Sequence, residues 1–172
     1  MRLILKNKLI FSVVSLLMVV LLTGCPYSSS VPIDEGTVKI PVELAGQWIV
    51  AEENESENPT FFVISIDDSY HATAKKMEFS ATDSSYMPTI YHLTFSDVDG
   101  ETFMNAQEAG INTYNLYKFN FNIKTGEIST SEITDYIKEV FNTSKELKEF
   151  ISKNKSNSYF YTNTTDNYRR KL

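Results

Sequence analysis

The sequence has one cysteine, two histidines and fewer basic than acidic residues. A single cysteine cannot pair within the chain, so a disulfide-stabilised scaffold is excluded. With 16 basic against 22 acidic residues, the chain also lacks the basic footprint of a nucleic-acid-binding protein. Its six glycines are scattered and form no phosphate-binding loop. What is present is 42% hydrophobic and 13% aromatic residues over 172 positions, which predicts one folded domain and excludes intrinsic disorder.

Motifs of common enzyme classes are absent as well. The chain contains no G-x-S-x-G, no H-E-x-x-H and no S-x-x-K set. The run from Asp67 to His71 contains the residue types of a hydrolase triad, but triads are assembled by geometry, and Asp67 to Ser69 predict a turn. No acidic pair is singled out for acid–base chemistry. We therefore expect a protein that is not an enzyme and needs no cofactor.

The two histidines, His71 and His92, are the candidate residues for a metal site. If their strands form a hairpin around residues 80–85, the two side chains lie nearly opposite each other on one face. An imidazole pair needs further ligands to hold zinc or copper. The opposite face of the second strand is the more apolar one, so we expect two solvent-exposed histidines and no metal.

The N-terminus has the organisation of a signal peptide. Three basic residues precede the stretch from Leu9 to Leu22, which is apolar apart from two serines and shorter than the roughly 20 residues of a membrane span. It ends in Leu22-Thr23-Gly24-Cys25, which resembles a bacterial lipobox. The resemblance implies that residues 1–24 are removed and that Cys25 is lipidated. The alternative is an ordinary secretory signal with an incidental cysteine.

Removal of residues 1–24 takes away three basic residues and no acidic one, so the net charge changes from −6 to −9. The mature chain, with this negative charge, is expected to be repelled by an anionic membrane surface. Residues 25–40 show no apolar periodicity and predict a lipidated tether, which would reach roughly 45–50 Å when extended. In enterobacterial sorting, an aspartate directly after the lipidated cysteine favours the inner membrane. Because Pro26 stands there, that resemblance implies the outer membrane, facing the periplasm, while Asp34-Glu35 leaves surface exposure open.

From Pro41 onward the signals are mostly those of β-structure. The alternation of Tyr117, Phe119, Phe121 and Ile123 with polar residues is the clearest strand pattern. Short strands with close turns favour an antiparallel meander over βαβ units. Seven strands are expected before residue 132, within or near residues 48–50, 60–66, 70–79, 89–95, 102–106, 114–123 and 127–131.

The pattern changes after residue 132. Ile133, Ile137 and Phe141 have helical spacing, although a strand followed by a turn fits too. Thr143 to Glu146 fits a capping box, which predicts a helix over residues 144–153 that packs through Leu147, Phe150 and Ile151 and covers an open end or edge. A late strand is expected near residues 159–161 and a flexible tail over residues 163–172.

Gly46-x-Trp48, preceded by the turn-like Pro41 and Leu44, resembles the opening of lipocalins and their calycin relatives. There the tryptophan packs across one end of a β-barrel, and a helix follows the barrel. The resemblance implies a lipocalin-like domain over residues 41–162. The chain departs from the pattern in having seven rather than eight strands before the helix, and in showing no arginine assigned to pack on the tryptophan. The fold class expected is mainly β, an antiparallel meander forming a small barrel or strongly curved sheet, with one C-terminal α-helix and a late strand.

A small barrel of this kind can hold one apolar ligand. Aromatic residues that could line such a cavity are plentiful, so we expect a binding protein. The lipobox adds a membrane anchor, and the acidic charge balance argues against a nucleic-acid partner. The same residues could instead fill a solid core, and a protein–protein module such as an inhibitor, immunity or assembly factor is the second hypothesis. The candidate ligand-binding residues are Trp48, Tyr70, Tyr91, Phe95, Tyr117 and Phe119.

Overall fold

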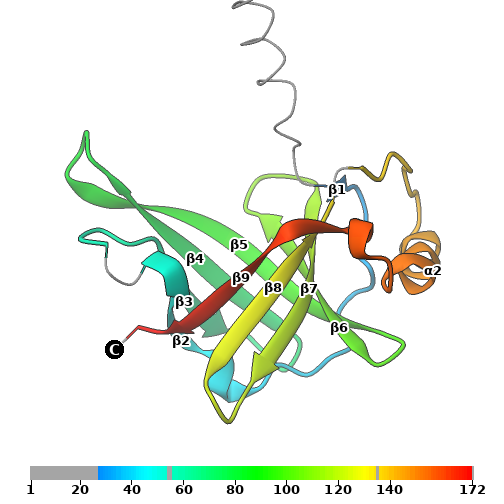
Figure 1. The fold of residues 1–172 in the computed structure, drawn as a ribbon, viewed down its shortest axis with the longest axis horizontal. Helices are drawn as coiled ribbons and strands as arrows, with labels where there is room; N and C mark the ends of the chain where they lie inside the picture. The colour runs from blue at the N-terminus through cyan, green and yellow to red at the C-terminus, as the bar shows by residue number, and fades with distance from the viewer. Residues whose placement is uncertain (1–26, 54–55, 135, 172) are drawn as a thin grey trace, which may run out of the picture.

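The computed structural model describes residues 27–53, 56–134 and 136–171. The predicted signal peptide and Cys25 lie outside the described residues. Within these described residues, nine strands and one α-helix follow one another (Figure 1). They are β1 (Ser28–Ser29), β2 (Gly46–Val50), β3 (Phe61–Ile66), β4 (His71–Ser80), β5 (Ser85–Val98), β6 (Glu101–Glu108), β7 (Tyr114–Asn122), β8 (Glu127–Ile133), α2 (Ser144–Asn154) and β9 (Tyr161–Arg170), with three short 3₁₀ turns, η1 (Val42–Leu44), η2 (Ala51–Glu53) and η3 (Ser158–Phe160).

Eight of the strands, β2 to β9, form a closed antiparallel barrel. Strands β2 to β8 follow one another as a meander, and β7 pairs with β8. β9 then returns after the helix and lies between β8 and β2 (Figure 1). The predicted fold class is confirmed, and the seven strands expected before the helix are all present. The eighth barrel strand comes after the helix in the chain.

The alternation of side chains explains the two sides of the barrel wall. On β7, Tyr117, Phe119 and Phe121 point inward, where they pack with Trp48 from β2. Leu116 points outward and is fully buried beneath other parts of the chain. The barrel therefore has an inner apolar cluster and a second one on its outer wall.

One end of the barrel is closed and the other is open. At the closed end, Ile40 and Leu44 from the segment around η1 are buried against Trp48 and Ile128. The open end is formed by the end of β2, the start of β3, the β4–β5 hairpin, the β6–β7 turn and the junction of β8 with β9. The hairpin projects beyond the wall as an arm (Figure 1).

Helix α2 begins with the predicted capping box. Thr143 Oγ1 accepts from the backbone N–H of Glu146, whose carboxylate accepts from the backbone N–H of Thr143. Leu147 and Ile151 are fully buried and Phe150 partly so. However, the helix covers the outer wall and not an end of the barrel, because its apolar stripe meets outward-facing side chains from β5, β6 and β7.

Residues 27–40 are not the free tether that was expected. β1 pairs with β7, and Ile33 is fully buried on the outer wall. The buried Asn105 side chain fixes this segment, since its Oδ1 accepts from Ile33 N–H at 2.8 Å and its Nδ2 donates to Ser96 Oγ at 3.0 Å. Ser96 in turn donates to Asp34 at 2.6 Å, and Asp34 pairs with Lys148 of α2 at 2.7 Å. This polar chain joins three distant parts of the sequence, so no local pattern reveals it.

Two expectations about the C-terminal third are corrected. Residues 163–172 were expected to be flexible, but β9 extends to Arg170 because both of its edges pair with barrel strands. The described residues between Ile133 and Thr143 form no helix. Ile133 is the last residue of β8, and the chain then crosses to α2 through turns. The alternative of a strand followed by a turn is the one observed.

Candidate ligand-binding cavity

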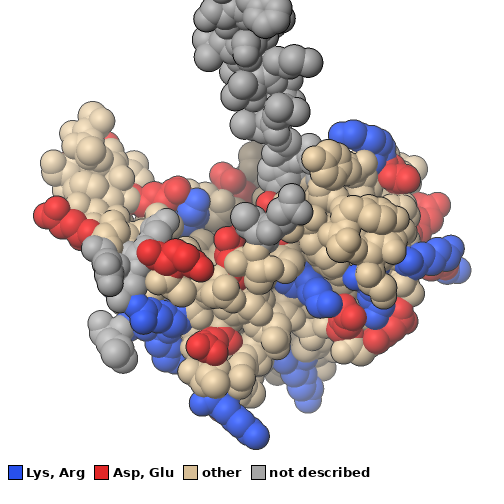
Figure 2. Space-filling model, viewed as in Figure 1, with Lys and Arg blue, Asp and Glu red and all other residues tan. Residues whose placement is uncertain are grey.

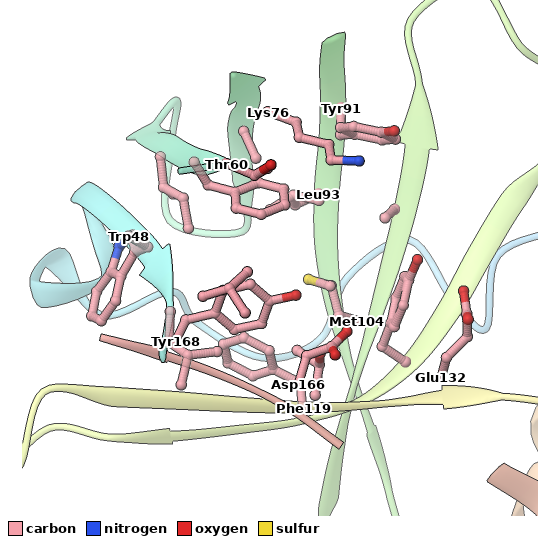
Figure 3. A pocket seen from close by; sticks show the side chains of 18 of the residues that line it. Trp48, Thr60, Lys76, Tyr91, Leu93, Met104, Phe119, Glu132, Asp166 and Tyr168 are labelled. Carbon is pink, nitrogen blue, oxygen red and sulfur yellow. The ribbon is translucent and has the colours of Figure 1, made fainter. Parts of the chain in front are cut away.

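The barrel interior contains a cavity of about 450 Å³ that leads toward the open end. Its walls come from every barrel strand, so the cavity belongs to the barrel as a whole (Figure 3). Apolar and aromatic side chains make up most of the lining, and polar ones gather toward the open end. The principal lining residues are Trp48, Phe62, Ile64, Tyr91, Leu93, Met104, Tyr117, Phe119, Ile128 and Tyr168.

Four of the six candidate ligand-binding aromatics line this cavity: Trp48, Tyr91, Tyr117 and Phe119. Trp48 lies deepest, near the closed end, where its indole N–H donates to the Leu44 carbonyl at 2.8 Å. Because this hydrogen bond satisfies its polar atom, Trp48 offers the cavity a purely apolar surface.

The other two candidates lie elsewhere. Phe95 belongs to the inner cluster and is buried, with its ring 4.7 Å from that of Phe119, so it packs against the lining without reaching the cavity. Tyr70 lies in the bend before β4 at the closed end and does not line the cavity. It was expected to belong to the strand, whereas the Asp68 carboxylate accepts hydrogen bonds from the backbone N–H groups of Tyr70 and His71 and fixes a bend over residues 68–70, after which β4 begins at His71.

A polar cluster on β7, β8 and β9 faces the same cavity. Tyr117 hydrogen-bonds to Glu132, and Tyr168 hydrogen-bonds to Thr130 and Asp166. Burial raises the pKa of Glu132, with a contribution from the charge of Asp166, although the hydrogen bond from Tyr117 opposes this shift. Burial and the neighbouring carboxylates raise the pKa of Tyr168 to about 12 and raise that of Tyr117 further. Both phenols therefore stay neutral at physiological pH.

This polar cluster was missed in the sequence. Glu132 follows Ile128 and Thr130 at two-residue intervals on β8, which places it on the inward face. That signal was available, but the strand was expected to end at residue 131. Asp166 had no such signal, because it lies in the stretch that was expected to be a tail.

The mouth of the cavity also carries an ion pair between a half-buried lysine and an exposed glutamate. Lys76 and Glu78 on β4 approach to 2.8 Å. Four charged side chains line the cavity. Three of them are acidic, Glu78, Glu132 and Asp166, and one is basic, Lys76. On the face seen in Figure 2, acidic side chains stand beside the hollow between the projecting hairpin and the rest of the molecule. The mouth therefore favours a neutral or positively charged group over an anion.

Arg170 fixes the closed end of the barrel. Its guanidinium lies over the Trp48 ring, 4.9 Å from the ring centroid, and donates to the carbonyls of Ala45 and Glu43 in the η1 segment. Gly46 leaves room for it, because a Cβ there would lie 2.5 Å from the guanidinium, and the φ of +141° disfavours other residues. An arginine does pack on the tryptophan, and it went unrecognised because the tail that contains it was expected to be flexible.

The two histidines lie on the outer face of the β4–β5 pair, where both are exposed. The hairpin assumed for them is present, with His71 opposite Thr94 and His92 opposite Thr73. His71 Nδ1 lies 2.9 Å from the Asp68 carboxylate. Within the described part of the chain, no group of three or more His, Cys, Asp or Glu side chains could hold a metal ion.

No helix among the described residues is long and apolar enough to cross a membrane. Comparison with known proteins found no matching family model, no matching curated protein and no matching solved structure. The barrel, its cavity and the N-terminal motif are therefore the features of this protein that bear on its function.

Proposed function

We propose that the protein is a lipid-anchored bacterial lipoprotein whose barrel binds a small apolar ligand without catalysing a reaction on it. The observation that carries the binding proposal is the cavity of about 450 Å³ inside the barrel. Ligand sites in proteins typically have volumes of roughly 300–1,000 Å³ and mostly apolar walls with a few polar groups. The cavity meets both conditions.

The closed end supports a lipocalin-like assignment. The barrel is of the expected type, Gly46 and Trp48 form the expected motif, and Arg170 packs on Trp48. In this arrangement one end of the barrel is sealed by side chains and the other stays accessible. We therefore propose a lipocalin-like binding protein that loads its ligand through the open end.

The lining suggests the chemistry of the ligand. The aromatic and aliphatic surface around Trp48 and Phe119 suits an apolar body. Nearer the mouth, Glu132 and Asp166 disfavour an anionic group and can accept hydrogen bonds from a neutral or cationic one. We propose a neutral or weakly basic apolar molecule as the ligand class.

Binding can be tested with N-phenyl-1-naphthylamine, a neutral apolar probe that fluoresces in apolar surroundings. Wild-type protein is expected to enhance its fluorescence saturably. Ala74 and Ala106 line the cavity, so the double variant Ala74→Phe/Ala106→Phe is expected to weaken binding at least about tenfold by occupying the space. Ala109→Phe, an added ring at an exposed position beyond β6, is the matched control and is expected to bind like wild type.

A wild-type protein that leaves the probe dark would contradict the ligand-binding proposal. The urea midpoint of each variant, followed by Trp48 emission, shows whether a loss of binding reflects unfolding. If Ala74→Phe/Ala106→Phe folds normally and still binds the probe, the binding site is not inside the barrel.

The proposed anchor is tested separately. Cys25→Ser is expected to move the protein from the membrane fraction to the soluble fraction, because several acyl chains together anchor a protein stably. Density-gradient separation of the membranes should place the wild type in the outer membrane. Retention of the unprocessed Cys25→Ser chain in the membrane at the wild-type level would refute the lipobox interpretation.

The second candidate function is an envelope protein–protein interaction module. It is favoured by the β4–β5 hairpin, which projects from the barrel and exposes Met87 over 53% of its surface. Under this proposal, Met87→Ser abolishes capture of the partner from native envelopes and leaves binding of the naphthylamine probe unchanged. If the wild type and Met87→Ser capture equal amounts of the partner, the hairpin is not the contact surface.

A further inference from the structure

The first described residue of the chain lies at the open end of the barrel. Tyr27 is only 8% exposed, its backbone N–H donates to the carbonyl of Ile133 at 3.4 Å, and its hydroxyl donates to the carbonyl of Glu139 at 3.2 Å. Directly after it, β1 pairs with Tyr114 and Asn115 at the start of β7. The end of β8 and the start of β7 both belong to the open end, so Tyr27 is fixed at its rim.

The segment that follows Tyr27 holds it in place. Ile33 is fully buried, and Asp34 is held by Ser96 of β5 and by Lys148 of α2. From the rim, the chain runs along the outer wall and reaches the closed end at Ile40. Because both ends of this segment are packed, it cannot swing away to act as a long tether.

Only two peptide steps separate Tyr27 from Cys25. Their α-carbons are therefore at most about 7 Å apart. β7, with nine residues, is about 30 Å long, and a strand tilt of about 40° puts the closed end roughly 20–25 Å from the open end. A lipid on Cys25 consequently holds one particular end of the barrel close to the head groups.

The distribution of exposed apolar side chains points to the same end. Eight large hydrophobic residues in the described part of the chain are exposed by more than a third. Two of them, Val42 and Ile123, are at the closed end. The other six lie in segments that begin or end at the open end, and they are Met87, Ile90, Ile111, Tyr136, Val140 and Tyr159.

We infer that the open end of the barrel faces the membrane that holds Cys25, so that the cavity opens toward the lipid. This inference rests on the proposed lipid anchor. The apolar side chains at the rim suit the interfacial region of a bilayer, whereas the acidic mouth repels anionic head groups. The short link between Cys25 and Tyr27 keeps the rim of the barrel close to the membrane, even though the acidic domain is not attracted to it. A cavity that opens toward the bilayer can take up an apolar molecule dissolved in the bilayer, and this is the ligand class that we infer.

The orientation can be measured with a matched pair of labels. Ile111→Cys in the β6–β7 turn and Ile123→Cys in the β7–β8 turn replace the same residue at similar exposures, 48% and 57%, at opposite ends of one strand. The sequence has one cysteine, and lipidation converts it to a thioether, so each variant carries a single reactive thiol. Each lipidated protein is labelled with a bimane maleimide and reconstituted into phosphatidylcholine vesicles containing head-group spin-labelled lipid.

The label at position 111 is expected to be quenched at least about threefold more strongly than the label at position 123. Equal quenching, or stronger quenching at position 123, overturns the inference. Insertion of twelve Gly/Ser residues directly before Tyr27 provides a second test. It should lower quenching at position 111 to the level at position 123, while binding of the naphthylamine probe stays at the level of the parent.

Flotation of the vesicles separates this inference from the proposal on which it depends. A protein that does not float with the vesicles has no anchor, which overturns both. A protein that floats and binds the probe, but is quenched equally at both positions, retains the proposed function and overturns the orientation alone.

Discussion

Arg170→Ala is expected to weaken the barrel by about 2 kcal/mol. Arg170 is exposed, so each of its interactions is assigned the lower part of the usual range. A cation over an aromatic ring contributes about 0.5–1 kcal/mol at an exposed site, and each hydrogen bond to a backbone carbonyl about 0.5–1 kcal/mol. The side chain makes one of the former and two of the latter, through Trp48, Ala45 and Glu43. For a chain of this length the loss corresponds to a fall in Tm of about 4–8 °C.

The assay is urea unfolding in a background that lacks residues 1–24 and carries Cys25→Ser. Trp48 is the only tryptophan, and it lies directly beneath the guanidinium, so its emission reports both global unfolding and the local contact. Arg169→Ala is the matched control, because Arg169 is also exposed but points to the other side of β9. It is expected to change stability by less than about 0.5 kcal/mol.

Arg170→Lys separates charge from shape. Lysine keeps the charge but lacks the planar fork that reaches two carbonyls at once, so it is expected to recover less than half of the loss. If Arg170→Ala and Arg169→Ala have the same unfolding free energy within error, Arg170 does not hold the closed end in the way described.

Three further substitutions test other features. Gly46→Ala is expected to cost about 2–3 kcal/mol in urea unfolding, because of its positive φ and the close guanidinium, whereas Gly126→Ala, with a positive φ and open space, costs about 1 kcal/mol. For Asp34, hydrogen bonds from Lys148 and Ser96 outweigh the effect of burial and lower its pKa. The contribution of Asp34 to the stability of the fold is therefore complete above its unfolded-state pKa of about 3.9 and is lost as the pH falls through its folded-state pKa. The stability difference between wild type and Asp34→Asn should therefore be constant near neutral pH and vanish in acid; a difference that persists unchanged at pH 2 would contradict this. Asn105→Leu leaves the Ile33 N–H and the Ser96 hydroxyl without their partner, is expected to cost about 2–4 kcal/mol, and should speed proteolysis at residues 27–40.

Several elements could be predicted because local patterns determine them. The alternation around Tyr117 and Phe119 predicts β7, and the sequence from Thr143 to Glu146 predicts the start of α2. The Gly46-x-Trp48 motif predicts the beginning of the barrel. In each case, residues within a few positions of one another make the interactions that define the element.

Other elements depend on distant partners. β9 is rich in Thr, Asn and Arg and lacks a clear apolar alternation, so its strand character comes from pairing with β2 and β8 on its two sides. The segment from Tyr27 to Lys39 resembles a linker in composition, yet Asn105, far along the sequence, fixes it to the wall. The polar part of the cavity was missed for the same reason, because Asp166 becomes an inward-facing residue only when β9 enters the barrel.

The place of β9 in the barrel has a consequence for folding. The barrel closes only when residues 161–170 insert between β2 and β8, which are among the first and the last strands of the meander. Until β9 is in place, β2 and β8 both present unpaired edges, and Trp48 lacks its arginine cover. A chain in which residues 161–170 are missing or not yet paired therefore remains an open sheet whose two edges can pair with other chains. Insertion of β9 is thus the step that protects the barrel from aggregation.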